Sequence, residues 1–122
     1  MTMVKRSELA QDLTPTQADA LTNWLYSDPP TVIISSGIIT VDGSGWYLVQ
    51  SESGVADDLI RINGCKRGEV VTISAINGHT ITVVAGANLQ LQNNANATLN
   101  NQYRLMNFRS FGSDILAELS FR

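Results

Sequence analysis

The sequence predicts a mainly β protein whose short antiparallel strands form a β-sandwich or a β-prism-like domain. From Thr31 onward apolar residues recur with a period of two, and Gly, Asn and Asp separate short runs rich in Val, Ile and Thr. The chain has 122 residues, the length of one domain. A domain of this size buries about two-thirds of the surface of its unfolded chain, so we expect a single core.

The first thirty residues have a different pattern, which predicts one short helix in an N-terminal arm. Thr14 is a suitable N-cap, Pro15 occupies the first helical position, and Gln17 lies at the capping-box position. The helix should end before Pro29 and Pro30, because a residue that precedes proline is disfavoured in the helical region. We therefore divide the chain into a helical anchoring arm, residues 1–30, and a β-domain, residues 31–122.

The predicted helix carries the candidate partner-binding residues. Leu21, Trp24 and Leu25 fall on one helix face at positions i, i+3 and i+4, which is the spacing of a docking stripe. Tyr26 adds a second aromatic side chain beside them. We expect these four residues to contact another protein.

Two hairpins are predicted within the β-domain. The strands Thr31–Val41 and Trp46–Val49 flank the loop of residues 42–45, whose sequence is Asp-Gly-Ser-Gly. The strands Val70–Ile76 and Thr80–Val84 flank an Asn-Gly pair at residues 77–78, a strong hairpin signal because both residues tolerate positive φ.

A half-buried strand is predicted at the end of the chain. One alternating set there is apolar and the other is mostly polar, so one face should be buried and one mostly exposed. The first set is Ile115, Ala117, Leu119 and Phe121, and the second is Asp114, Leu116, Glu118 and Ser120.

Composition excludes several partner classes. The net charge of −3 lacks the basic excess that binding to nucleic acid or to an anionic membrane requires. The sequence has no secretory signal and no apolar run of about 20 residues, so we expect a soluble protein that is made in a cytoplasm. One Cys and one His cannot form an intrachain disulfide or a Cys/His metal site, and no metal or other cofactor is expected.

The most informative charge pattern is the lack of Asp, Glu, Lys and Arg between Val70 and Tyr103. Exposed strand edges of monomers are usually protected by charges, Lys above all. The stretch therefore indicates surfaces that meet other subunits. The alternative is a set of Asn-rich strands and loops that lacks charge by chance.

No catalytic residue is predicted, which disfavours a polysaccharide-cleaving enzyme. His79 follows the Asn-Gly turn, where a solvated turn residue is far more common than a general base. Cys65 precedes two cations that could lower its pKa, but a loop or core thiol is the preferred interpretation. Asp57 and Asp58 are neighbours whose side chains should point to opposite faces, so a turn or cap role is preferred to a calcium site.

Trp46 and Tyr47 are the second aromatic pair. As neighbours on one strand they point to opposite faces, so only one of them can lie in the core. The other is available on the surface or at an interface. We favour a core or subunit contact over a sugar-stacking platform, because a carbohydrate site usually combines several aromatics and the chain is poor in them.

The stretch from Ile38 to Ser120 resembles a β-domain of tail fibres, head fibres and capsid decoration proteins of tailed phages. Similar proteins have, in order, an Asp-Asp-Leu segment, an Ile-x-Gly turn, a Gly-x-x-Val-x-Ile strand, a Thr-Val strand, an Asn-Leu-x-Leu strand and a closing Glu-Leu-Ser. Here these elements are residues 57–59, 62–64, 68–73, 82–83, 88–91 and 118–120. The chain departs from the pattern in having Ile115-Leu116-Ala117 where similar domains often have Trp.

The resemblance implies a homotrimer with an intertwined β-structure and a place on the exterior of the virion capsid. The implied function is that of a capsid decoration (cement) protein whose arm binds the major capsid protein and which stabilises the head. The alternative is a short head or tail fibre that contacts a host surface glycan or protein.

Overall fold

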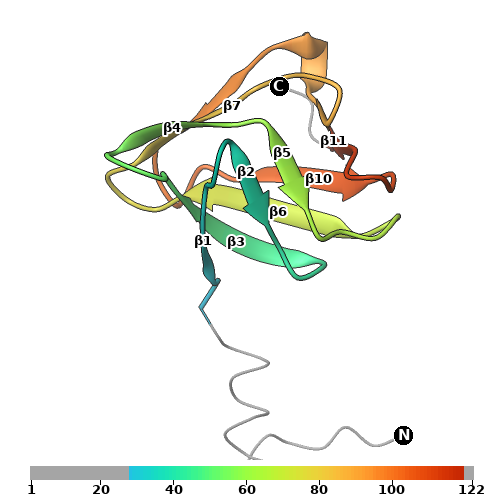
Figure 1. Cartoon of the computed structure of the whole chain (residues 1–122), viewed down its shortest axis with the longest axis horizontal. Helices are drawn as coiled ribbons and strands as arrows, with labels where there is room; N and C mark the ends of the chain where they lie inside the picture. The colour runs from blue at the N-terminus through green and yellow to red at the C-terminus, as the bar shows by residue number, and fades with distance from the viewer. Residues whose placement is uncertain (1–27, 120–122) are drawn as a thin grey trace, which may run out of the picture.

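The computed structural model describes residues 28–119, which form a β-solenoid of three coils closed by an antiparallel segment (Figure 1). The first coil contains β1 (Thr31–Ile33) and β2 (Ile38–Thr40). The second contains β3 (Gly45–Gln50), β4 (Ala56–Leu59) and β5 (Arg61–Asn63). The third contains β6 (Val70–Ala75), β7 (Thr80–Val83) and β8 (Leu89–Gln90). The closing segment contains the 3-10 helix η1 (Gln92–Asn94), β9 (Ala97–Leu99), β10 (Met106–Ser110) and β11 (Leu116–Glu118).

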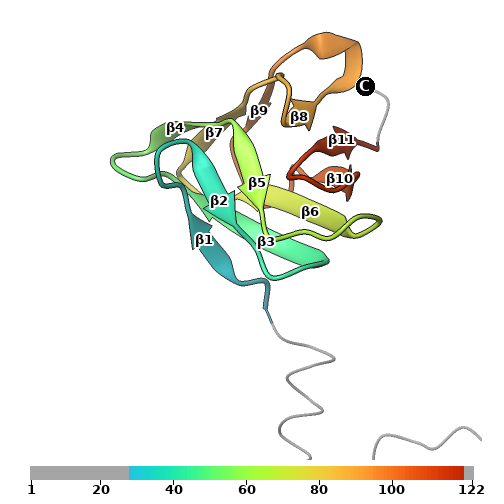
Figure 2. The ribbon, with the colours of Figure 1, turned by 45° about the vertical axis from the view of Figure 1, so that its right-hand side comes forward.

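Each coil pairs with the next through parallel strands. β1 pairs with β3, β3 with β6, β2 with β5, and β4 with β7, all in parallel. Figures 1 and 2 show β2 and β5 side by side in front of β3 and β6. Parallel neighbours need a long crossover connection, and here the other sides of the coil provide it. The domain is thus mainly β as predicted. The predicted sandwich or prism-like domain of antiparallel strands is wrong, because the coils stack through parallel strands.

The closing segment completes a six-stranded sheet with the order β1-β3-β6-β10-β11-β8. β10 is antiparallel to both β6 and β11, and β9 is antiparallel to β7. β11 also pairs in parallel with β8. The chain therefore returns across the last coil and covers the edges of β6 and β7.

Neither predicted hairpin forms, although both turns exist. β2 pairs with β5 and β3 with β1 and β6, so the residue 42–45 loop connects two different sheets. At the second turn the N–H of His79 donates to the carbonyl of Ile76 at 3.1 Å, and Gly78 has a φ of +86°. Asn77 has no positive φ. This geometry is that of a type II turn, which splays the flanking strands instead of twisting them into a hairpin.

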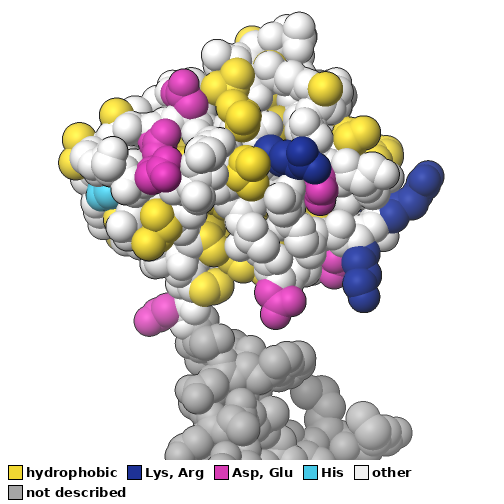
Figure 3. Space-filling model, viewed as in Figure 1, with side chains coloured by type: hydrophobic (Ala, Val, Ile, Leu, Met, Phe, Trp, Pro, Cys, Tyr) yellow, Lys and Arg dark blue, Asp and Glu magenta, His cyan; other side chains and the backbone are white. Residues whose placement is uncertain are grey.

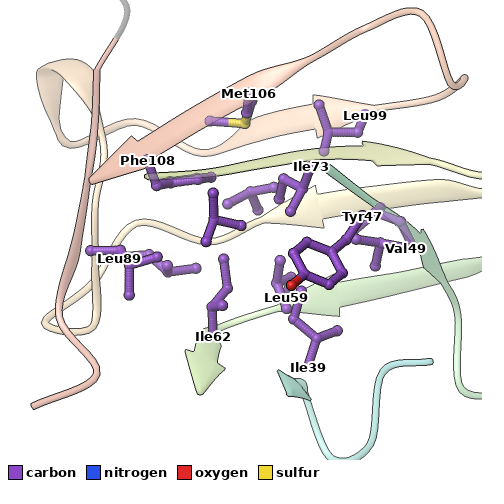
Figure 4. Packing of buried hydrophobic residues seen from close by; sticks show 14 of the residues in the cluster. Ile39, Tyr47, Val49, Leu59, Ile62, Ile73, Leu89, Leu99, Met106 and Phe108 are labelled. Atoms are coloured by element: carbon purple, nitrogen blue, oxygen red, sulfur yellow. The ribbon is translucent and has the colours of Figure 1, made fainter. Parts of the chain in front are cut away.

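The core fills the interior of the coils. Side chains at equivalent positions of successive coils lie in register, as Val32 does with Val49 and Tyr47 with Ile73. Figure 4 shows Ile39, Leu59 and Ile62 pointing toward Phe108 and Leu89 from the other side of the solenoid. Burying large aliphatic side chains stabilises a fold by about 1.5–3 kcal/mol each, so this interior is the main source of stability.

Gly64 lies where two coils touch. Its φ is +101°, which L side chains rarely adopt. A Cβ atom there would lie 1.9 Å from the carbonyl oxygen of Val41, on the preceding coil. The backbone of Val41 is also held in place, because its N–H donates a hydrogen bond to the carbonyl of Asn63 at 2.8 Å. The glycine of the Ile-x-Gly turn is thus required by backbone packing between coils.

The final strand is present as β11, but its buried face is the mostly polar set. Leu116 is fully buried and Glu118 is 8% exposed, whereas Ile115 and Leu119 are exposed. The carboxylate of Glu118 accepts a hydrogen bond at 2.9 Å from the backbone N–H of Gln92, at the start of η1. A buried carboxylate is tolerated when charge-assisted hydrogen bonds replace its water. The apolar set is therefore left on the outside.

Candidate interaction surface

The outer face of the six-stranded sheet, called here the outer sheet face, is the most distinctive surface of the described chain. It consists of the residues that alternate with the core residues on its strands. The register aligns them in rows across the sheet. The central rows are Trp46, Thr72, Asn107 and Leu119, and Thr31, Leu48, Ser74 and Leu105. Ile33 with Gln50 lies at one end, and Val70, Arg109, Ala117 and Gln90 at the other.

Large apolar side chains on the outer sheet face are exposed. The exposed fractions are 57% for Ile33, 41% for Trp46, 51% for Leu105 and 45% for Leu119. Single exposed apolar residues are normal on a protein surface, but four on one sheet face form a patch. Such patches typically mark interaction sites.

The outer sheet face is nearly uncharged. Arg109 is the only charged side chain at these positions, all of which lie within residues 28–119, and it occupies an end row. Other surfaces differ: Arg61 on β5 forms an ion pair with Asp114 at 2.8 Å, and Asp58 on β4 is exposed. Figure 3 shows acidic and basic side chains on the side where β2, β4 and β5 lie in front.

Two pairs of side chains in the central rows of the outer sheet face are hydrogen-bonded across strands. The indole Nε1–H of Trp46 donates to Oγ of Ser74 at 3.0 Å. The hydroxyl of Thr72 donates to Oδ1 of Asn107 at 2.6 Å. A polar group that is already satisfied loses little when water is removed from it. Covering this face therefore costs less than covering an ordinary polar surface.

A pocket of about 380 Å³ lies at the end of the sheet where the described chain begins. Its lining includes Asp28, Pro29 and Pro30, together with Trp46 and Tyr47. The hydroxyl of Tyr47 donates to the carbonyl of Gly43 at 3.0 Å. Burial raises the pKa of Tyr47 above its ordinary 10.0. Trp46 and the carboxylate of Asp28 are thus the groups of this pocket available to a ligand.

The prediction for the aromatic pair is confirmed: Tyr47 is 6% exposed and lies in the core, while Trp46 lies on the outer sheet face. The four candidate residues of the arm, Leu21, Trp24, Leu25 and Tyr26, and the predicted helix lie outside the described residues.

His79 has a structural role that the sequence did not reveal. Its Nδ1 accepts the backbone N–H of Ser51 at 3.2 Å and lies 3.0 Å from the Ser51 hydroxyl. That hydroxyl donates to the carbonyl of Gly54. Ser51 is 2% exposed, so a substrate cannot reach its oxygen. The pair has the composition of a nucleophile and base, but it links the end of β3 to the start of β7 in the next coil.

Cys65 does not have the lowered pKa that its two cationic neighbours suggested. Burial raises its pKa, and the carboxylates of Glu69 and Asp114 raise it further. Lys66 and Arg67 are exposed and do not reverse this effect. The thiol is thus a poor nucleophile at neutral pH, in agreement with the preferred interpretation as a loop or core thiol.

Of the two adjacent aspartates, Asp57 binds backbone groups with its carboxylate. Oδ2 of Asp57 accepts the N–H of Glu52 at 2.8 Å, and its Oδ1 accepts the N–H of Asp58 at 2.8 Å. Asp57 lies on β4 and not in a turn, but its carboxylate caps the backbone N–H of Glu52 in the preceding loop, which is the cap role of the prediction. Within residues 28–119 no group of three His, Cys, Asp or Glu side chains is arranged to hold a metal ion.

The uncharged stretch from Val70 to Tyr103 supplies only part of the outer sheet face. It contributes Val70, Thr72 and Ser74 from β6 and Gln90 from β8, while the rest comes from β1, β3, β10, β11 and the residues directly beside them. The signal in the sequence that could have indicated the rest of this face is the alternation within Trp46–Gln50 and Leu105–Arg109. Only the coil register shows that these two segments share one face.

Comparison with protein-family models, with curated proteins and with solved structures yields no match for this chain. Across residues 28–119, no helix has the length and apolar character needed to cross a membrane.

Proposed function

We propose that this protein is a non-enzymatic structural component of a tailed-phage particle, a trimeric decoration protein on the capsid exterior. The observation that carries the proposal is the nearly uncharged outer sheet face with its four exposed apolar side chains, whose composition suits contact with another protein chain. The resemblance of residues 38–120 to phage decoration and fibre domains supports the same class. The major capsid protein is the proposed partner of the N-terminal arm.

In this role the arm binds the capsid and the β-domain forms the trimer. Three arms on one trimer bind a capsid lattice far more tightly than one arm, because the second and third contacts become intramolecular. The β-domain provides the trimer, and the stripe of Leu21, Trp24 and Leu25 provides the capsid contact. Decoration raises the temperature at which the particle breaks, since a ligand that binds the assembled state stabilises it.

The arm assignment is tested by removing residues 1–27. The deletion must stop there, because the carbonyl of Pro30 accepts the N–H of Leu48 at 2.9 Å and so belongs to the sheet. We expect the truncated protein to remain trimeric and to lose binding to undecorated capsids in a co-sedimentation assay. Normal occupancy on the heads would show that the arm is not the anchor.

A second candidate function is a short head or tail fibre that binds a host surface glycan. It is favoured by one observation, the pocket whose lining includes both Trp46 and Asp28. An aromatic face beside a carboxylate is a common arrangement for stacking a sugar and binding its hydroxyls. Under this alternative the purified protein blocks adsorption of the phage to cells, and Trp46→Ala abolishes the block. Under the decoration hypothesis it leaves adsorption unchanged and raises the temperature of capsid breakage.

A further inference from the structure

The size of the outer sheet face fits an interface between protein chains. The strands β1, β3, β6, β10, β11 and β8 have 3, 6, 6, 5, 3 and 2 residues. With a rise of about 3.3 Å per residue and a strand spacing of about 4.8 Å, the face measures roughly 400 Å². In a trimer the three faces can turn toward the threefold axis, where each meets the other two. A specific interface buries about 1,000 Å² or more, so the face would form the centre of the contact and adjoining surfaces would complete it.

The charge pattern identifies the kind of partner. A partner with charged side chains would bury them against a face that has only Arg109 to offer, and an unpaired buried charge is costly. The partner surface must therefore be nearly uncharged and have its polar groups satisfied. The described chain has two other sheets, and their outer surfaces are charged: the sheet of β2 and β5 carries Arg61, and the sheet that contains β4 and β7 carries Asp58. Further copies of the same face fit this description best, since each is nearly uncharged and the polar groups of its central rows, Trp46 with Ser74 and Thr72 with Asn107, are already paired.

The neighbouring edge of the sheet has the same character. β1 is the edge strand, and its residues Thr31, Val32 and Ile33 carry no charge. Exposed edge strands are normally protected by charged side chains or by proline, and here only Pro29 and Pro30 precede the strand. Ile33 is 57% exposed at this edge. An uncharged edge beside an uncharged face extends the surface that a second copy would cover.

We infer that the outer sheet face is the self-association surface of this protein, with Trp46 and Leu105 at its centre and Arg109 at its rim. The inference rests on the proposed homotrimer and adds the face that each subunit turns toward the others. Trp46 is the expected principal contact, because central aromatic side chains contribute most to binding and its indole N–H is already paired with Ser74.

The test is sedimentation equilibrium of the full chain, which has a mass of 13.2 kDa, at micromolar concentration. We expect a trimer for the natural chain and a shift toward monomer for Leu105→Arg, with the association constant reduced roughly tenfold or more. Ile60→Arg is the matched control, because Ile60 is 48% exposed against 51% for Leu105 but lies between β4 and β5. This control should remain trimeric.

Leu119→Arg is a second variant on the same face, and circular dichroism of each variant verifies the fold. If Leu105→Arg does not fold, Leu119→Arg tests whether this face holds the subunits together. A folded variant on this face that stays trimeric overturns the assigned face but leaves the trimeric decoration protein standing. A monomeric natural chain overturns both. Dissociation by Leu105→Arg, together with failure of the natural trimer to bind capsids, supports the face and contradicts the decoration function.

Discussion

The two faces of the six-stranded sheet differ in what covers them, although large apolar side chains lie on both. On the inner face Val49, Ile73 and Phe108 are fully buried by the other strands of the coils. On the outer face Trp46, from β3, and Leu105, which directly precedes β10, remain exposed. An apolar side chain on a strand thus does not by itself identify the face that the fold buries. The difference teaches that the inner face stabilises the single chain, while the outer face is suited to contacts between chains.

The largest expected effect separates the two faces on one strand. Phe108→Ala should lower the free energy of unfolding by about 3–5 kcal/mol, because it leaves a cavity in the core. Leu105→Ala, at an exposed position just before the same strand, should change it by less than about 0.5 kcal/mol in the dissociated chain. Urea denaturation at low protein concentration measures both values. Equal losses would mean that the outer face also stabilises the single subunit.

Contacts between coils are tested at Gly64. Gly64→Ala should cost about 2–5 kcal/mol, from strain at positive φ together with displacement of the Val41 backbone. Gly68→Ala is the matched control: its φ is +92° and no atom lies within 4 Å of its Cβ position, so it reports the strain alone. Thermal unfolding of both variants distinguishes the strain at positive φ from the cost of displacing the Val41 backbone. A Gly64 variant no worse than the Gly68 variant would contradict the close contact between coils.

A smaller effect is expected at the polar link between coils. His79→Ala leaves the backbone N–H of buried Ser51 without its acceptor, which should cost about 1–3 kcal/mol. His79→Asn can restore an acceptor and should recover part of the loss. Chemical denaturation compares the two variants. If His79 were a base in an active site, a fluorophosphonate probe would label Ser51, and we expect no labelling.

The smallest effect is a loss of stability at alkaline pH. Burial raises the pKa of Cys65 and Tyr47 in the folded state, so folding favours their protonated forms. Their contribution is complete below the ordinary values of 9.0 and 10.0 and is lost as the pH rises through the folded values. The free energy of unfolding should therefore fall above about pH 9. Tyr47→Phe should reduce this decline, whereas Trp46→Phe on the opposite face should not.

Part of this fold could be predicted from the sequence. The period of two and the turn residues predicted the positions of β3, β6 and β7, and the alternation at Trp46 and Tyr47 predicted their opposite faces. Pairing could not be predicted, because the choice between a hairpin and a coil depends on the φ of Asn77, which that residue type leaves open.

The face that β11 buries could not be predicted either. Hydrophobicity alone favours Ile115, Ala117 and Leu119 as the buried set. Glu118 is buried instead because Gln92, which is distant in sequence, supplies a hydrogen-bond donor to its carboxylate. The outer sheet face could not be predicted for a similar reason, since its residues come from segments that only the coil register brings together.

The assignment of the outer sheet face is tested most directly by the solvent exposure of Trp46 in the assembled protein. In a Trp24→Phe background Trp46 is the only tryptophan. Its acrylamide quenching can then be compared with that of the same protein carrying Leu119→Arg. We predict weaker quenching and a blue-shifted emission when Leu119 is retained, because subunits cover Trp46. Equal quenching in two folded proteins, with the Leu119-containing protein assembled, would show that this face stays in solvent and would contradict the account.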